Sequence, residues 1–379
     1  MSQQGPLEGI RVIEIGGIGP APHACMLLAD LGADLIRVDR PGGNPLAGGP
    51  HDFLTRGRPS VALDLKHPEG RRAVLSLVAA ADALVEGMRP GTMERLGLGP
   101  EECLAVNDSL VYGRMTGWGQ SGPLAHTAGH DINYIATAGA LHGSGQDPDR
   151  PHFASNLVGD FGGGSTYLVI GLLSALLHAR SSGVGQVVDA AVLDGTAHLN
   201  AMAASYLADG TLVEQRAVNA LDGGRPWYDV YATADGRHLA VGAIEAKFYA
   251  ELMHRLGLAN EAHLRDDPDR WPELRSAIAD KIASRTMREW QKIFDDTDAC
   301  VAPVLTMTEA ARHPHVAARG VFDESDGTLQ PAPAPRFSVT PTHRGSPPAA
   351  SPGAHTREAL NAWGVDAEAL IAVGAAVQD

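Results

Sequence analysis

The chain has 379 residues, more than one hydrophobic core usually covers, so we expect two domains or one large domain with an insertion. Its formal net charge of −15 at pH 7 argues against a nucleic-acid-binding surface. The three cysteines lie far apart and form no CxxC pair. This spacing excludes a disulfide framework and a cysteine metal site, and it favours a reducing, cytoplasmic compartment.

The longest apolar run extends from Ser165 to Ala179. It is too short and too interrupted to span a bilayer, and it predicts a buried helix. The first residues show no basic segment followed by an apolar one, so we expect no signal peptide. Neither a membrane nor a nucleic acid is therefore expected among the partners.

The first half of the chain alternates strand and helix patterns. Residues 9–17 are typical of a buried strand, 21–32 of a helix ended by Gly32, and 33–40 of a second strand, which together make a βαβ unit. Continued alternation predicts an α/β fold, a doubly wound Rossmann-like domain whose mostly parallel sheet is covered by helices. The further strands are expected at 58–65, 81–88 and 108–118, and a helix at 67–80.

The second half begins with the same pattern and then changes. After the 165–179 helix we expect a strand at 185–195 and a helix at 198–212. Residues 228–243 alternate around Asp235 and Gly236, which is typical of a β-hairpin. Further helices are expected at 245–258, across 271–294 and from 356 to 364, with an extended proline-rich stretch at 330–355.

These patterns divide the chain into a large and a small domain. The large Rossmann-like domain is expected in residues 1–205, completed by 330–379, and the small α+β domain in 222–320. A linker is expected at 206–221 and a proline-rich return segment at 321–350.

The turn after the first strand imitates a dinucleotide-binding fingerprint. Gly17 and Gly19 precede a helix, and Asp39 follows twenty residues later at the end of the second strand. The third glycine position is Pro22, however, which lacks a backbone N–H and bars close helix–strand packing. We therefore prefer a tight turn feeding a proline-started helix, and rank an NAD-dependent oxidoreductase last.

His130 and Asp131 stand where a helical pattern begins. Apolar residues with helical spacing follow them, so both fall at a helix N-terminus, where unpaired backbone N–H groups favour negative charge on a bound group. Such an end can act as an oxyanion hole, and the alternative is that His130 is a satisfied core histidine. The apolar positions are Ile132, Ile135, Ala136 and Ala140.

Asp160 precedes three glycines and a second apolar helix. Glycines let a ligand approach the backbone closely, and the apolar helix excludes water. A carboxylate there should have a raised pKa and could serve as a base. The alternative is a plain helix N-cap.

Several motifs in consistent order resemble the family III coenzyme A transferases, and most closely the branch of α-methylacyl-CoA racemases. The resemblance extends from about residue 6 to about residue 340. It implies a large Rossmann-like domain and a small domain, with two chains interlocked as a homodimer. The motifs include "GHDINYIATAGALH", "NLVGDFGGGS", "SSGVGQVVDAAVLDG", "RMTGWGQSGPLA" and "EGMRPGTMERLGLGPEE".

The resemblance implies racemisation of 2-methylacyl-CoA thioesters by proton exchange at the carbon beside the thioester carbonyl. His130 and Asp160 would be the two acid/bases, and the Asp131 backbone N–H would donate to the thioester oxygen. Glu245 matches a small-domain glutamate that hydrogen-bonds the histidine. No metal or other cofactor is implied, because CoA is part of the substrate.

Cationic residues at matching positions would hold the phosphates of CoA, and Glu86, from its proximity alone, is expected to orient the Arg89 turn. The acyl group is not readable from the sequence, and Met115, Met202 and Leu221 are candidates for its surface. The expected CoA-binding residues are Arg40, Leu63, Asp64, Leu65, Lys66, Gly87, Met88, Arg89, Arg95, Gly129, Asn133 and Tyr134.

Two other functions compete with the racemase. A CoA transferase of the same family would use Asp160 as a nucleophile that forms an acyl anhydride. Transferases of the family tend to have an aromatic residue at the position of His130, so the histidine favours the racemase. A non-catalytic acyl-CoA-binding protein is a more remote alternative, because the chain retains all four expected catalytic residues.

Overall fold

The computed structural model describes residues 5–44, 46, 49 and 51–379. The chain divides into two compact units, which are described separately. The first contains the chain up to Ala138 together with Ala154–Asn200 and Gly320–Asp379. The second contains Gly139–Phe153 and Ala201–Arg319, so residues 206–221, the expected linker, group with it.

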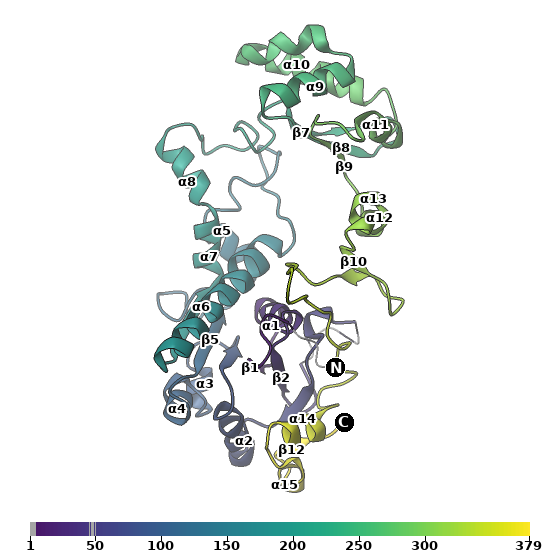
Figure 1. Cartoon of the computed structure of the whole chain (residues 1–379). Coiled ribbons are helices and arrows are strands. Elements are labelled where there is room, and N and C mark those ends of the chain that lie inside the picture. Colours follow the sequence, from purple (N-terminus) through teal and green to yellow (C-terminus); the bar gives the residue numbers. More distant parts are fainter. Residues whose placement is uncertain (1–4, 45, 47–48, 50) are drawn as a thin grey trace. The chain divides into compact units, whose positions relative to one another are not determined.

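The first unit contains a seven-stranded sheet in the order β12-β3-β2-β1-β4-β5-β6 (Figure 1). All neighbours pair in parallel except β12, which is antiparallel to β3. The parallel strands thus have the 3-2-1-4-5-6 order of doubly wound folds, which confirms the α/β prediction. The strands are β1 (Arg11–Ile15), β2 (Asp34–Asp39), β3 (Ser60–Leu63), β4 (Ala83–Glu86), β5 (Val111–Thr116), β6 (Gln186–Ala191) and β12 (Ala376–Val377).

Helices cover both faces of this sheet, whose central strands β1 and β4 are largely buried. In β1, Ile13 and Ile15 belong to one buried cluster and Val12 to the other. The first cluster includes residues of α2 (Pro68–Val78), α3 (Thr92–Arg95), α4 (Pro100–Val106), α14 (Thr356–Ala362) and α15 (Ala367–Ala372). The second includes residues of α1 (Pro20–Asp30) and α6 (Thr166–Ser182).

Helix α6 is preceded by the π-helical segment Leu157–Ser165, which the sequence patterns did not predict. A Cβ on Gly113 would lie 2.8 Å from Leu172 Cδ2, so α6 packs closely on β5 at this glycine. By length and composition alone, Leu157–Ser182 could also cross a membrane. Such a helix is weak evidence of a membrane span, because core helices share these properties.

Two other boundaries differ from those predicted. The strand expected at 185–195 ends at Ala191, and α7 (Val192–Leu199) begins six residues before the expected helix at 198. The helix expected after His130, α5 (Asp131–Thr137), ends after seven residues. In α5 only Asp131 and Ile135 are buried, whereas Ile132 is exposed. The apolar residues with helical spacing expected after His130 therefore do not form one face packed into the core. The return segment contains the short strands β10 (Phe322–Asp323) and β11 (Gln330–Pro331).

The second unit contains a three-stranded antiparallel sheet in the order β7-β8-β9, packed against helices. The predicted hairpin is present in β7 and β8, with Gly236 at φ 71° in its turn. The helix expected across 271–294 is two helices separated at 283–286. The elements are α8 (Ala201–Ala208), β7 (Tyr228–Ala232), β8 (His238–Gly242), α9 (Ala246–Leu256), α10 (Trp271–Ile282), α11 (Met287–Phe294), β9 (Val301–Pro303), α12 (Met307–Arg312) and α13 (Pro314–Ala318).

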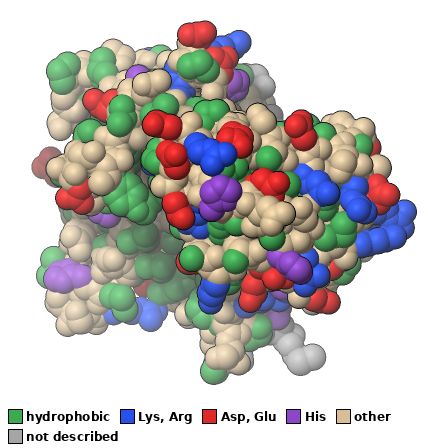
Figure 2. All heavy atoms as spheres, turned by 90° about the horizontal axis from the view of Figure 1, so that it is seen from above, with side chains coloured by type: hydrophobic (Ala, Val, Ile, Leu, Met, Phe, Trp, Pro, Cys, Tyr) green, Lys and Arg blue, Asp and Glu red, His purple; other side chains and the backbone are tan. Residues whose placement is uncertain are grey.

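Charged side chains of both signs are intermixed over the face drawn in Figure 2, with histidines among them. Charge on this face is thus dispersed.

Candidate active site

A cavity of about 450 Å³ lies in the first unit at the ends of β1, β4 and β5. Its walls include the turn after β1 (18–21), the turn after β4 (87–90) and the end of β5 with its following loop (115–118). In a doubly wound sheet the strand order reverses between β1 and β4, and ligands bind outside the carboxyl ends of the strands at that point. The cavity is therefore where this fold places a ligand.

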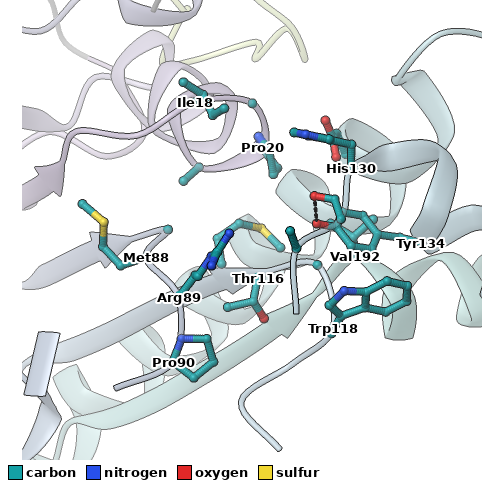
Figure 3. A pocket seen from close by; sticks show the side chains of 18 of the residues that line it. Ile18, Pro20, Met88, Arg89, Pro90, Thr116, Trp118, His130, Tyr134 and Val192 are labelled. Atoms are coloured by element: carbon teal, nitrogen blue, oxygen red, sulfur yellow. Dashed lines mark hydrogen bonds between the residues drawn. The ribbon is translucent and has the colours of Figure 1, made fainter. Parts of the chain in front are cut away.

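His130 borders this cavity at the start of α5. It is exposed, and its backbone N–H donates to Asn133 Oδ1 at 3.0 Å, which closes the first turn. In Figure 3 the His130 ring extends toward Pro20, while Trp118 and Tyr134 lie beside each other with ring centroids 4.8 Å apart. The imidazole is thus accessible from the cavity.

Asp160 reaches the same cavity from the π-helical segment. Its backbone N–H donates to Asp131 Oδ1 at 2.7 Å, and Asn156 Nδ2 donates to its carboxylate at 3.4 Å. Asp131 is 7% exposed, and its Oδ2 has no hydrogen-bond partner among the described residues. The Asp131 carboxylate therefore connects the starts of the two segments that present His130 and Asp160.

Burial raises the pKa of Asp160 above its usual value. The Asn156 hydrogen bond opposes this shift, the nearby Asp131 carboxylate adds to it, and His130 opposes it. Because Asp160 lies inside a helical segment, it is not the N-cap considered as its alternative role. A half-buried carboxylate with a raised pKa is suited to taking up and releasing a proton.

The turn after β4 is held by Glu86, which is fully buried. Its carboxylate accepts from the Met88 N–H at 2.6 Å and from Arg114 Nε at 3.0 Å, and burial raises its pKa to about 7. Glu86 acts on the Arg89 turn through the Met88 N–H, but its ionic partner is Arg114 and it has no bond to the Arg89 side chain among the described residues. Glu86 instead fixes the backbone one residue before Arg89, which borders the cavity.

A second cavity, of about 230 Å³, brings together three expected CoA-binding residues, Leu65, Lys66 and Arg95. His67 and Arg71 also border it, and neither was expected from the sequence. Arg71 lies one helical turn into α2, so a search for cations facing Lys66 could have found it.

The remaining expected binding residues are dispersed. Gly87, Met88, Arg89, Gly129 and Tyr134 border the first cavity, as does Met115. Asp64 accepts from the Lys66 N–H, Asn133 binds the His130 N–H, and Leu63 is fully buried in the core, which leaves only its backbone for a ligand. Arg40 donates to the Gly43 carbonyl and borders neither cavity. Glu245, Met202 and Leu221 belong to the second unit.

The residues that border the first cavity without having been expected there include Ile18, Pro20, Trp118 and Val192. The turn containing the first two was recognised, but it was judged only as a nucleotide motif. Its place after the central strand of a doubly wound sheet is the signal that could have assigned it to the site.

Comparison with known proteins gives a family and named relatives. The model of CoA-transferase family III matches residues 7–356. Alpha-methylacyl-CoA racemase of Mus musculus is 42% identical over 96% of this chain and 95% of its own, and that of Homo sapiens is 41% identical over the same shares. Succinyl-CoA–D-citramalate CoA-transferase of Chloroflexus aurantiacus is 33% identical over 89% of each chain. The crystal structure of a CAIB/BAIF family protein from Brucella suis superposes with a TM-score of 0.81 at 25% identity, over 95% of this chain and 100% of that one.

Proposed function

The chain belongs to CoA-transferase family III, and we propose that within this family it is an isomerase that interconverts (R)- and (S)-2-methylacyl-CoA thioesters. The observation that carries the proposal is that His130 and Asp160, two groups able to exchange protons, border one cavity. The racemases of mouse and human align with nearly the whole chain, which supports the same reaction. The predicted resemblance to the racemase branch is confirmed by these relatives.

The reaction requires a proton to leave the carbon beside the thioester carbonyl and another to arrive from the opposite face. One group takes the proton from one enantiomer, negative charge develops on the carbonyl oxygen, and the second group delivers a proton to the other face. His130 and Asp160 fill these two roles and exchange them in the reverse direction. No electron transfer is involved, so the proposal includes no redox cofactor.

The developing enolate needs a hydrogen-bond donor, and the Asp131 backbone N–H is our candidate. Asp131 is the first residue of α5, and in the described part of the chain no group accepts from its backbone N–H. Asp131 itself is held by the hydrogen bond from Asp160. A donor fixed before the reaction stabilises the enolate without reorganisation.

The second cavity is our proposed site for the CoA phosphates. Lys66, Arg71 and Arg95 supply three cations around it, in a chain whose net charge is −15. Phosphate oxygens bind such cations through charge-assisted hydrogen bonds. CoA enters as part of the substrate and leaves as part of the product.

Three further assignments stay proposals that rest on the family resemblance and the composition. Glu245, directly before α9, would orient the histidine, and two chains would interlock as a homodimer. The structure contains three free cysteines, Cys25, Cys103 and Cys300, which supports a reducing cytoplasmic location.

Proton NMR of the purified protein with (S)-2-methylacyl-CoA in D2O, without a second carboxylic acid, tests the reaction. We expect the α-proton signal to disappear and the (R)-thioester to form. If nothing happens until a free carboxylate such as succinate is added, and CoA then moves to it, the protein is a transferase with Asp160 as its nucleophile.

A further inference from the structure

His23 on α1 contacts the π-helical segment that contains Asp160. Its ring stacks on Phe161, the next residue after Asp160, with centroids 4.3 Å apart and an interplanar angle of 22°. Its Nδ1 lies 2.6 Å from Ser165 Oγ at the end of the same segment. One side chain thus touches the segment at two points.

The hydrogen bonds around Ser165 define which ring nitrogen holds the proton. Ser165 is fully buried, and its hydroxyl donates to the Phe161 carbonyl at 2.9 Å. A hydroxyl has one hydrogen, and with that hydrogen on the Phe161 carbonyl we assign Ser165 as the acceptor from His23 and the His23 proton to Nδ1. The Phe161 carbonyl also accepts from the Thr166 N–H, the i to i+5 bond of the π turn, and from Thr166 Oγ1 at 2.8 Å.

The first turn of α1, the helix that carries His23, also contacts the Asp160 carboxylate. Its backbone N–H donates to the Gly19 carbonyl at 3.2 Å and closes the first turn of α1. A Cβ on Gly19 would lie 3.4 Å from Asp160 Oδ2, so the carboxylate rests against this turn. The first turn of α1, which contacts the carboxylate, and the His23 side chain, which contacts Phe161 and Ser165, thus belong to the same helix.

We propose that His23 is a positioning residue for Asp160, which acts by donating from Nδ1 to Ser165 and by stacking on Phe161. The inference rests on the proposed racemase function and adds a residue to it. Burial lowers the pKa of His23 to about 4, and the Arg56 and Arg58 charges act in the same direction. His23 thus stays neutral in the pH range where Asp160 works, and keeps the single ring N–H that Ser165 requires.

The test measures α-proton exchange in D2O from each enantiomer of the thioester separately. Asp160→Asn first identifies the enantiomer whose exchange needs Asp160. For that enantiomer, His23→Phe, which keeps the stacking and loses the donor, should exchange about tenfold more slowly relative to the other enantiomer, since small displacements of a reacting group are costly. Ser165→Ala should show the same one-sided loss, and the double variant should lose no more than either single variant.

The conservative variant His23→Asn can place an amide N–H near the position of Nδ1, so it should retain exchange within about threefold, the effect of one weakened hydrogen bond. His178→Asn, an exposed histidine on α6, is the matched control and should not alter either exchange rate. If His23→Phe and Ser165→Ala slow both enantiomers equally, or neither, the positioning role is wrong. If the unmodified protein exchanges neither enantiomer, the racemase proposal itself fails before any variant is compared.

Discussion

Two opposing influences act on the pKa of the Asp160 carboxylate. Burial and the Asp131 carboxylate favour its protonated form, while Asn156 and His130 favour the ionised form. A base for a carbon acid benefits from this balance, because a carboxylate with a raised pKa binds the abstracted proton more strongly. The same environment makes the ionised side chain a cost to folding.

Asp160→Asn should therefore be slightly more stable than the parent protein at neutral pH. When the folded pKa is raised, the folded state holds more protons than the unfolded one, so stability falls as pH rises through that window. We expect an advantage on the order of 0.5 kcal/mol for this half-buried group at pH 7.5. It should vanish below the ordinary aspartate pKa of about 3.9.

Thermal melting of both proteins across this pH range is the measurement. A variant that is less stable at pH 7.5, or an advantage that grows on acidification, would show that the Asp160 charge is stabilised by its surroundings.

The π-helical segment packs closely against α7 because it contains glycine where the two elements meet. A Cβ on Gly163 would lie 2.6 Å from the Thr196 backbone nitrogen and 2.4 Å from its Oγ1, so α7 packs directly on this glycine. Because backbone atoms of Thr196 cannot turn aside, the glycine sets the distance between the two elements. The glycine-rich sequence after Asp160 thus serves helix packing.

Gly163→Ala should destabilise the first unit by about 1–3 kcal/mol, the usual cost of overpacking. The melting temperature is the measurement. Gly143→Ala is the control, because nothing lies within 4 Å of a Cβ built on the exposed Gly143. Equal melting temperatures for both variants would contradict the close packing of α7 on the segment.

Long elements with a clear pattern of apolar residues were predictable from the sequence. Elements that depend on partners distant in the sequence were not. The strands β1, β2, β4 and β5 are apolar runs that are buried on both faces, and each was expected. Strand β9 has three residues and β12 two, and they exist only because β8 and β3 supply their hydrogen bonds. The π-helical segment was not predicted because four of its nine residues are glycine, which has a low intrinsic helix propensity.

In the candidate site, too, features with a local sequence pattern were predictable and contacts between distant residues were not. His130 and Asp131 were placed correctly at a helix start, because a polar pair preceded an apolar pattern. The hydrogen bond between Asp131 and Asp160 joins residues 29 apart, and the contact of His23 with Ser165 joins residues 142 apart. Such pairings follow from the packing of α1, α5 and the π-helical segment, which no local pattern encodes.

In the chain as a whole, one sheet supports two cavities for which we propose separate tasks. The turns after β1, β4 and β5 form the cavity with the two proposed acid/bases, whereas the end of β3, the start of α2 and α3 form the cationic cavity. A CoA thioester has the same division, with reacting carbon at one end and phosphates at the other. Binding energy at the phosphate end can thus support the reaction at the acyl end.

Arg95→Ala should weaken binding of a CoA thioester about tenfold, as expected for loss of a charge-assisted hydrogen bond, and should hardly affect a pantetheine thioester that lacks the nucleotide. The dissociation constants of both ligands, measured at low and high salt, provide the test. Arg72→Ala on α2 is the matched control, since exposed Arg72 pairs with Glu69 and does not border the cavity. Equal losses for both ligands would place Arg95 away from the nucleotide.

The most direct measurement is α-proton exchange in D2O from each pure enantiomer with His130→Ala and with Asp160→Asn. If the two groups act on opposite faces, each variant should lose epimerisation by at least about a hundredfold, the usual contribution of a general acid or base. Each should still exchange the α-proton of one enantiomer, and the two variants should retain opposite enantiomers. Retention of the same enantiomer by both variants, or normal epimerisation in either, would contradict the assignment of His130 and Asp160 as the two acid/bases.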